Sequence, residues 1–310
     1  MSREQRRALD ARLRSAPQAS GPVPVEQMRE GFAHFMSAFP VPSGITRTRV
    51  DVGGRPTVQV DPVGETHPGA ILYFHGGSFS LGSPETAMAL TGHLVERTRV
   101  RAVSIDYRLA PEHPFPAAIE DCLAAYRDLL DKGVAPQSIV LAGDSAGGGL
   151  AVTTTLAARK AGLPMPAGIL AFSPGLEHTR SGESMTVKEG VDPLFTAEGM
   201  RRTGDLYLNG QDPAQTLLAP AVLADLSGFP PILLQVGTNE LLLDDSVRLA
   251  ERARAADVDV ILDIVGDVPH VFPAFIGVID EADEALDRAA LFITQRIGTR
   301  KSGSPHQVAS

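Results

Sequence analysis

Short apolar runs rich in β-branched residues recur from residue 45 onward, and most are followed by an amphipathic stretch of helix length. The runs typical of strands are 45–52, 56–60, 70–75, 100–106, 138–143, 167–173, 231–237 and 258–266. The stretches typical of helices are 84–98, 116–132, 145–162 and 244–256. Strands that alternate with helices form a mostly parallel sheet with helices on both faces. We therefore predict an α/β fold around a central sheet of about eight strands, with antiparallel strands at its start, where no helix separates the first runs.

The first 45 residues are typical of helices rather than of strands. Four apolar side chains recur there at intervals of three and four residues, on one helical face: Phe32, Phe35, Met36 and Phe39. We expect this face to pack mainly as the core of a small helical cap, with contact to a substrate as the less favoured alternative. The opening residues contain arginines but no apolar core of a signal peptide, so we expect a cytoplasmic protein.

The segment 174–215 interrupts the alternation of strands and helices. It is far longer than an ordinary connection between two strands. It contains a predicted helix near 196–208, with Thr196 as its N-cap. We expect this insertion to join the N-terminal segment in a helical cap over a body that spans 46–297. The Gly/Ser-rich tail, 298–310, is expected to be disordered.

Composition excludes several classes of partner and site. The chain has 310 residues and a net charge of −9, which argues against nucleic acid and anionic membranes as partners. No apolar run approaches the length that spans a membrane. The single cysteine, Cys122, lies in an apolar setting and is expected in the core. The eight histidines lack the spacing of a metal site, so no bound metal is expected.

One serine, Ser145, lies among small residues directly after a predicted strand, in the sequence LAGDSAGGGL. Gly143 to Gly147 fit the pattern G-x-S-x-G, which requires a preceding strand and a following helix. The glycines permit a tight turn that presents the Ser145 hydroxyl, and the helix N-terminus behind it favours negative charge. The alternative is a structural glycine-rich turn, but the stretch fits neither dinucleotide-binding nor phosphate-binding patterns. We therefore interpret Ser145 as a nucleophile.

A nucleophilic serine needs a base and an acid that orients it, and for this kind of turn both follow the serine in the chain. Glu240 follows one late predicted strand, and His270 follows the next. Asp244 and Asp245 are rival acids, but they lie about one turn into a helix, where acidic residues are expected anyway. The other late histidine, His306, falls in the tail. The pattern therefore indicates His270 as the base and Glu240 as the acid.

Backbone donors for a developing oxyanion are predicted in YFHGGSF, which follows an apolar strand. Adjacent glycines let backbone N–H groups turn inward and approach a carbonyl oxygen. We assign the oxyanion hole to Gly76, Gly77 and Ser78, together with Ala146 after the nucleophile. His75 is expected to anchor this loop rather than to act in catalysis.

The ordered motifs HGGSF, GDSAGG, the acid after one late strand and PHVF after the next resemble those of the bacterial hormone-sensitive lipase-like esterases, family IV carboxylesterases. The resemblance covers nearly all of 45–297, including DYRLAPEHPFPAA. It implies an α/β-hydrolase fold with a cap, hydrolysis of short-to-medium acyl esters without a cofactor, and frequently a dimer through the last strand and helix. The chain departs from the family pattern at Ser78 (usually glycine), Glu240 (commonly aspartate) and Gly175 (usually tryptophan).

The motif DYRLAPEHPFPAA contains three charged residues, Asp106, Arg108 and Glu112. We expect them to form a structural network of ion pairs and turns beneath the site. Structural ion pairs are common, so direct contact of these residues with substrate is the less favoured alternative.

These features together predict a serine carboxylesterase with the triad Ser145, Glu240 and His270, a small-molecule ester as substrate, and a possible homodimer. An amide or N-acetyl hydrolase with the same triad remains an alternative, because the early chemistry is shared. A non-catalytic small-molecule receptor on a hydrolase fold is less favoured, because such proteins typically lack a member of the triad, and fold alone does not settle function.

Overall fold

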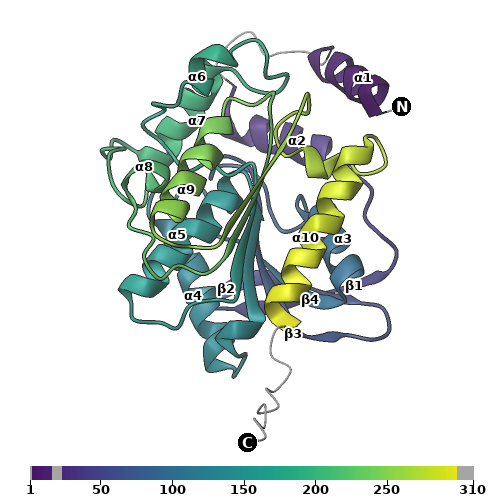
Figure 1. The fold of residues 1–310 in the computed structure, drawn as a ribbon, viewed down its shortest axis with the longest axis vertical. Coiled ribbons are helices and arrows are strands. Elements are labelled where there is room, and N and C mark those ends of the chain that lie inside the picture. The colour runs from purple at the N-terminus through teal and green to yellow at the C-terminus, as the bar shows by residue number, and fades with distance from the viewer. Residues whose placement is uncertain (1, 16–22, 299–310) are drawn as a thin grey trace, which may run out of the picture.

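A single eight-stranded sheet forms the centre of the computed structural model, which describes residues 2–15 and 23–298 (Figure 1). The strand order is β1-β2-β4-β3-β5-β6-β7-β8. The strands are β1 (Ile45–Val52), β2 (Arg55–Pro62), β3 (His67–Phe74), β4 (Val100–Ile105), β5 (Ile139–Asp144), β6 (Gly168–Phe172), β7 (Ile232–Gly237) and β8 (Val260–Val265). β2 is antiparallel to both β1 and β4, and the remaining neighbours are parallel. The mostly parallel sheet and its antiparallel start are confirmed.

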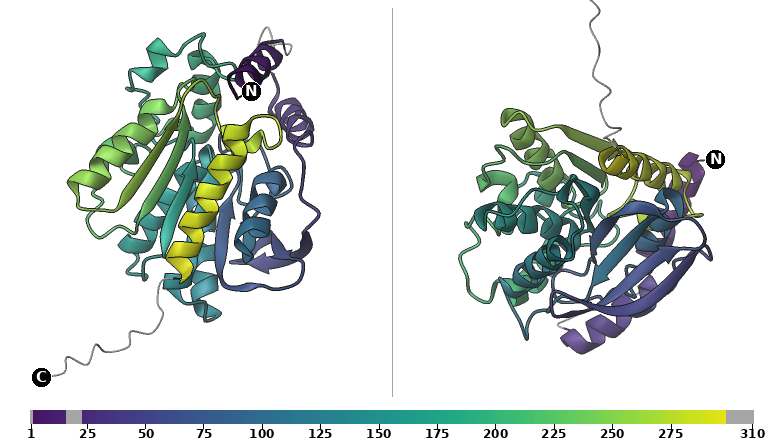
Figure 2. Two further views of the ribbon diagram at one scale, coloured as in Figure 1. Left: turned by 45° about the vertical axis from the view of Figure 1, so that its right-hand side comes forward. Right: turned by 90° about the horizontal axis from the view of Figure 1, so that it is seen from below.

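Helices cover both faces of this sheet (Figures 1 and 2). The α-helices are α1 (Ser2–Arg14), α2 (Val25–Met36), α3 (Met88–Thr98), α4 (Ala117–Asp131), α5 (Ala146–Lys160), α6 (Ser184–Val187), α7 (Ala197–Leu208), α8 (Pro220–Leu223), α9 (Leu243–Ala255) and α10 (Asp280–Gly298). Short 3₁₀ helices span Pro136–Ser138 and Phe272–Ala274. α4, α5 and α9 pack on one face of the sheet, and α3 and α10 on the other.

The central strands explain why the sheet has two cores. In β3, Leu72 and Phe74 pack against the α4 and α5 side, while Ile71 and Tyr73 pack against the α3 and α10 side. Successive side chains of a strand point to opposite faces, so a strand covered on both faces is apolar throughout. Cys122, as expected, is fully buried among the α4 side chains of the first core.

The two segments predicted to form a cap lie together at the carboxyl edge of the sheet, above the body (Figure 1). α1 is tied to the insertion by the guanidinium of Arg14, which donates to the carbonyls of Gly190 and Val191. The predicted helix near 196–208 is α7, and the Thr196 side chain accepts a hydrogen bond from the Gly199 N–H at 3.1 Å, which confirms the N-cap.

The C-terminal tail, 298–310, was predicted to be disordered. Apart from Gly298, which ends α10, it lies outside the described residues. None of the helices within residues 2–15 and 23–298 combines the length and the hydropathy needed to cross a membrane. The cytoplasmic location stays a prediction.

Candidate active site

Ser145 occupies the sharp turn between β5 and α5, with φ 53° and ψ −118°. Its N–H donates to the Phe172 carbonyl of the neighbouring strand at 2.8 Å. A Cβ atom on Gly147 would collide with the Phe74 carbonyl, and one on Gly143 would collide with the Gly147 backbone. The glycines on both sides of Ser145 are therefore required by close backbone approach, as the motif predicts.

The carboxylate of Glu240 and the imidazole of His270 meet at the carboxyl ends of β7 and β8. The Glu240 Oε2 and His270 Nδ1 atoms lie 2.8 Å apart, and both side chains are buried. The other carboxylate oxygen, Oε1, accepts hydrogen bonds from the Ser173 hydroxyl at 2.7 Å and from the Gly237 N–H. Glu240 therefore holds one ring nitrogen of His270 in a fixed orientation.

The second ring nitrogen of His270, Nε2, is buried and makes no hydrogen bond within the described residues. Burial lowers the pKa of His270, but the nearby charge and hydrogen bond of Glu240 outweigh it, so the pKa is raised above 6.5. Ser145 and His270 line the same cavity. The imidazole is thus oriented by one nitrogen and free to exchange a proton through the other.

Neither rival acid contacts His270. Asp245 is buried and accepts hydrogen bonds from the backbone N–H groups of Leu176 and Glu177. Asp244 accepts a hydrogen bond from the Ser184 N–H. Both aspartates lie in the first turn of α9 and hold the inserted segment in place.

Three of the four residues assigned to the oxyanion hole have free backbone donors. The N–H groups of Gly77, Ser78 and Ala146 donate to no acceptor among the described residues. The backbone of Gly76 instead lies against the Asp144 carboxylate and favours its charged form, which lowers the pKa of that group against the rise caused by burial, so we leave Gly76 out of the proposed hole. Asp144 lies beside Ser145, and its buried carboxylate accepts a hydrogen bond from the Tyr73 hydroxyl at 2.8 Å.

His75 lies behind this loop and contributes to its packing. Its Nδ1–H donates to the Gly76 carbonyl at 2.8 Å, and its ring stacks on Tyr107 at 4.1 Å between centroids. Burial lowers the pKa of His75 to about 4, so the ring is neutral at pH 7. This environment agrees with the expected anchoring role.

No ion pair joins Asp106, Arg108 and Glu112 directly to one another. Arg108 pairs with Asp121 of α4 at 2.8 Å, and Glu112 pairs with Arg29 of α2 at 2.7 Å. The backbone carbonyl of Asp106 accepts hydrogen bonds from an arginine of β2. The three residues therefore have structural partners, as expected, and none lines the cavity beside Ser145, but the partners come from outside the motif.

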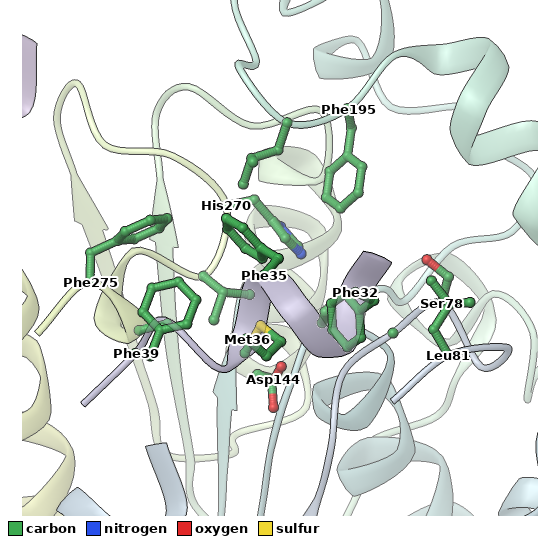
Figure 3. Close-up of a pocket in the computed structure, with 15 residues that line it drawn as sticks. Phe32, Phe35, Met36, Phe39, Ser78, Leu81, Asp144, Phe195, His270 and Phe275 are labelled. Atoms are coloured by element: carbon green, nitrogen blue, oxygen red, sulfur yellow. The ribbon is translucent and has the colours of Figure 1, made fainter. Parts of the chain in front are cut away.

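A mostly apolar cavity of about 190 Å³ opens onto Ser145 and His270 (Figure 3). Its other lining residues are Phe32, Phe35, Met36, Phe39, Gly77, Ser78, Leu81, Asp144, Leu194, Phe195, Val271, Ala274 and Phe275. The apolar face predicted from the N-terminal periodicity therefore lines this cavity rather than forming a cap core, and α2 has no buried residue. The periodicity shows that the face is apolar but not what lies opposite it.

Sequence reasoning missed two residues of the insertion. The ring of Phe195 meets the ring of His270 edge to face, with centroids 4.9 Å apart. The buried Asp192 accepts hydrogen bonds from the N–H groups of Leu194, Phe195 and Leu241, which fixes the loop above the imidazole. An aspartate before a turn is a recognisable signal, but its place over His270 is not.

The structure offers no obvious metal site: among the residues it describes, no three His, Cys, Asp or Glu side chains are grouped to hold an ion.

Comparisons with known proteins agree with this geometry. The α/β-hydrolase fold family matches residues 71–274. An acetyl-hydrolase of Streptomyces hygroscopicus is 40% identical over 228 residues, which are 74% of this chain and 76% of that protein. An esterase of Acinetobacter venetianus is 36% identical over 77% of this chain and 83% of its own length.

Solved structures extend the similarity to almost the whole chain. A hormone-sensitive lipase from a metagenome library is 40% identical, with a TM-score of 0.90 over 96% of this chain and 98% of its own. The esterase EstE5, soaked with p-nitrophenyl butyrate, is 38% identical, with a TM-score of 0.90 over 95% and 99%. The chain therefore belongs to the α/β-hydrolase fold family, and within it to the bacterial hormone-sensitive lipase-like ester hydrolases.

Proposed function

We propose that this protein is a serine carboxylesterase that hydrolyses short-to-medium acyl esters through Ser145, His270 and Glu240. The observation that carries the proposal is the 2.8 Å contact between Glu240 and His270 beside a cavity that Ser145 also lines. An imidazole held by a carboxylate on one nitrogen and free on the other is arranged to act as the base for a neighbouring hydroxyl.

In the first half of the reaction, the Ser145 hydroxyl oxygen attacks the ester carbonyl carbon while His270 Nε2 takes its proton. The carbonyl oxygen becomes an oxyanion, which the N–H groups of Gly77, Ser78 and Ala146 bind. Each such donor is worth about 3 kcal/mol in the transition state. Glu240 stabilises the imidazolium, which then protonates the leaving alcohol as the acyl-enzyme forms.

In the second half, His270 takes a proton from water, and the resulting nucleophile attacks the acyl carbon. The oxyanion again forms and collapses, this time with return of the proton to the Ser145 oxygen. The carboxylic acid leaves, and the free enzyme is restored. All atoms come from the ester and one water molecule, so the reaction uses no further reactant.

The chain-length preference rests on the size and polarity of the cavity. A dry apolar cavity of roughly 150 Å³ is large enough to hold a benzene molecule. The cavity of about 190 Å³ beside Ser145 therefore suits an apolar group of short-to-medium length. The soaking of EstE5 with p-nitrophenyl butyrate supports esters of this size as test substrates.

Removal of an acetyl group is a second candidate function, favoured by the 40% identical acetyl-hydrolase. An acetyl group on nitrogen would use the same triad, so matched acetyl ester and acetanilide substrates distinguish the two activities. The non-catalytic receptor alternative has no support among the relatives described above, which are named as hydrolases and esterases.

The proposal includes a homodimer. β8 ends the sheet, and it is hydrogen-bonded to β7 alone among the described strands. Ile261 and Ile264 of this strand are 50% and 45% exposed, and Leu291 of α10 is 57% exposed. An unpaired strand edge with apolar side chains favours pairing with another chain.

The first experiment measures hydrolysis of p-nitrophenyl esters with acyl chains from C2 to C12. We expect an optimum at short or medium chains, and a fall in kcat on the order of 10³–10⁶ for Ser145→Ala, because the triad acts as a unit. Ser227→Ala, at an exposed serine, is the matched control and should retain wild-type activity. Equal rates for wild type and Ser145→Ala would refute the proposed mechanism.

A further inference from the structure

Ser78 brings a hydroxyl group to a cavity wall that is otherwise formed mainly by phenylalanine, leucine, methionine and valine side chains. The other polar lining groups already have partners or roles. Ser145 and His270 are the proposed catalytic pair, and the carboxylate of Asp144 accepts a hydrogen bond from a tyrosine hydroxyl. Within the described residues, the hydroxyl of Ser78 makes no hydrogen bond. It is therefore available to a bound molecule.

The direction of this hydroxyl places it near the reacting atoms. Figure 3 shows the Ser78 oxygen directed into the cavity, toward the side where Phe195 and His270 lie. The N–H of the same residue is one of the three free donors of the proposed oxyanion hole. The hydroxyl is joined to that nitrogen through Cα and Cβ only. A substrate oxygen that contacts the hydroxyl must therefore lie close to the ester group.

The backbone of Ser78 is itself unusual. Its φ angle of 53° lies in the left-handed region, which glycine adopts freely and serine does not. A strained non-glycine residue beside reacting atoms suggests that its side chain has a use. A hydroxyl in apolar surroundings also loses hydrogen bonds to water when a ligand fills the cavity, unless the ligand replaces them.

We propose that Ser78 is a specificity-determining residue that favours esters with a neutral oxygen substituent on carbon 2 of the acyl group or of the alcohol. A hydroxyl can both donate to and accept from such an oxygen. The inference rests on the proposed function, because it places the ester carbonyl at the N–H groups of Gly77, Ser78 and Ala146. It goes beyond that function by naming a substituent that the substrate carries.

The test compares matched substrates in wild type, Ser78→Ala and Ser78→Gly. Ethyl 2-hydroxybutanoate against ethyl butanoate tests the acyl side, and 2-hydroxyethyl butanoate against propyl butanoate tests the alcohol side. Rates are followed by pH-stat titration, and the readout is the ratio of kcat/KM for each pair. Comparing this ratio between enzymes cancels the intrinsic reactivity of the esters. The comparison also stays valid if the absolute rates change, as they can when a residue of the oxyanion hole is altered.

We expect the ratio for one of the two pairs to fall about tenfold in both variants, the effect of losing one hydrogen bond between neutral groups. Ser78→Ala keeps a side chain at the strained position, whereas Ser78→Gly relaxes it. Equal falls in both variants therefore assign the effect to the hydroxyl. Thermal unfolding of each variant verifies that it is folded.

Three results would overturn the inference. An unchanged ratio for both pairs, with turnover still dependent on Ser145, would reject the role of the hydroxyl and leave the proposed function intact. A fall in Ser78→Ala without a fall in Ser78→Gly would assign the effect to the backbone. Turnover that is insensitive to Ser145→Ala would reject the proposed function and this inference with it.

Discussion

At the scale of single residues, the carboxylate of Glu240 connects three parts of the site. It accepts hydrogen bonds from the Ser173 hydroxyl and the Gly237 N–H, and it faces the ring nitrogen of His270. The Ser173 hydroxyl also accepts a hydrogen bond from the N–H of Val271, the residue after the histidine. One carboxylate and one hydroxyl thus fix both the imidazole and the backbone that carries it.

The pH dependence of activity follows from the same contact. Because Glu240 raises the pKa of His270 above 6.5, the imidazole is protonated, and inactive as a base, up to a higher pH than an ordinary histidine. We expect kcat/KM to fall as the pH is lowered, with a midpoint above pH 6.5. A profile measured between pH 5 and 9 verifies this; constant activity across that range would contradict it.

Replacing the acid should change both the rate and this midpoint. For Glu240→Gln we expect kcat to fall by about 10³–10⁴, since the ring loses its orientation and its compensating charge. The midpoint should move to lower pH, because burial then lowers the pKa of His270 without the opposing carboxylate. Asp244→Asn is the matched control and should keep nearly full activity. The opposite result, an active Glu240→Gln and an inactive Asp244→Asn, would reassign the acid.

The sequence alone was sufficient to propose Ser145, Glu240 and His270, because each follows a recognisable strand in a fixed chain order. It was insufficient for Gly76 and Asp192. Gly76 lies against a carboxylate from another strand, and Asp192 reaches the site through an insertion of irregular conformation. Hydrogen-bond partners that are distant in the chain leave no periodic pattern.

At the scale of elements, α2 is attached to the body by few polar contacts, and its apolar face lines the cavity. The guanidinium of Arg29 donates to the carbonyls of Ser80 and Ala110 and pairs with Glu112. No residue of α2 is buried. The periodicity predicted this helix and its apolar face, but the place of the face depends on a tertiary contact that periodicity does not encode.

Removing one aromatic side chain from α2 should therefore weaken substrate binding more than it weakens the fold. Phe35, which is 38% exposed, lines the cavity, whereas the next residue back, His34, does not. For Phe35→Ala we expect kcat/KM on p-nitrophenyl butyrate to fall about tenfold, since the lost apolar contact is worth roughly 1–2 kcal/mol. His34→Ala is the control. A Phe35→Ala variant with unchanged kinetics would show that substrate does not reach this wall.

At the scale of the whole molecule, the mostly parallel sheet and its antiparallel start were predictable, because helix-length stretches separate the later strands and not the first ones. The proposed association of two molecules depends instead on side chains at the edge of the sheet. β8 presents Ile261 and Ile264 there, beside an open row of backbone donors and acceptors.

A charge placed on that edge should separate the proposed dimer. We expect wild type to have twice the mass of one chain in solution, and Ile264→Lys to have the mass of one chain, because a lysine at a paired edge must be desolvated. Size-exclusion chromatography with light scattering measures both. Val63→Lys is the control. Val63 is 54% exposed and directly follows β2, near the edge of the sheet opposite β8. Persistence of the dimer in Ile264→Lys would place the interface elsewhere.

The shallow seating of α2 also has a consequence for evolution. The side chains that hold the sheet together lie in the two cores, whereas those that α2 presents to the cavity contribute little to either core. Mutations on this helix can therefore alter the substrate range of the enzyme with little effect on the stability of the fold. A lineage of such proteins can acquire new substrates while its scaffold is inherited unchanged.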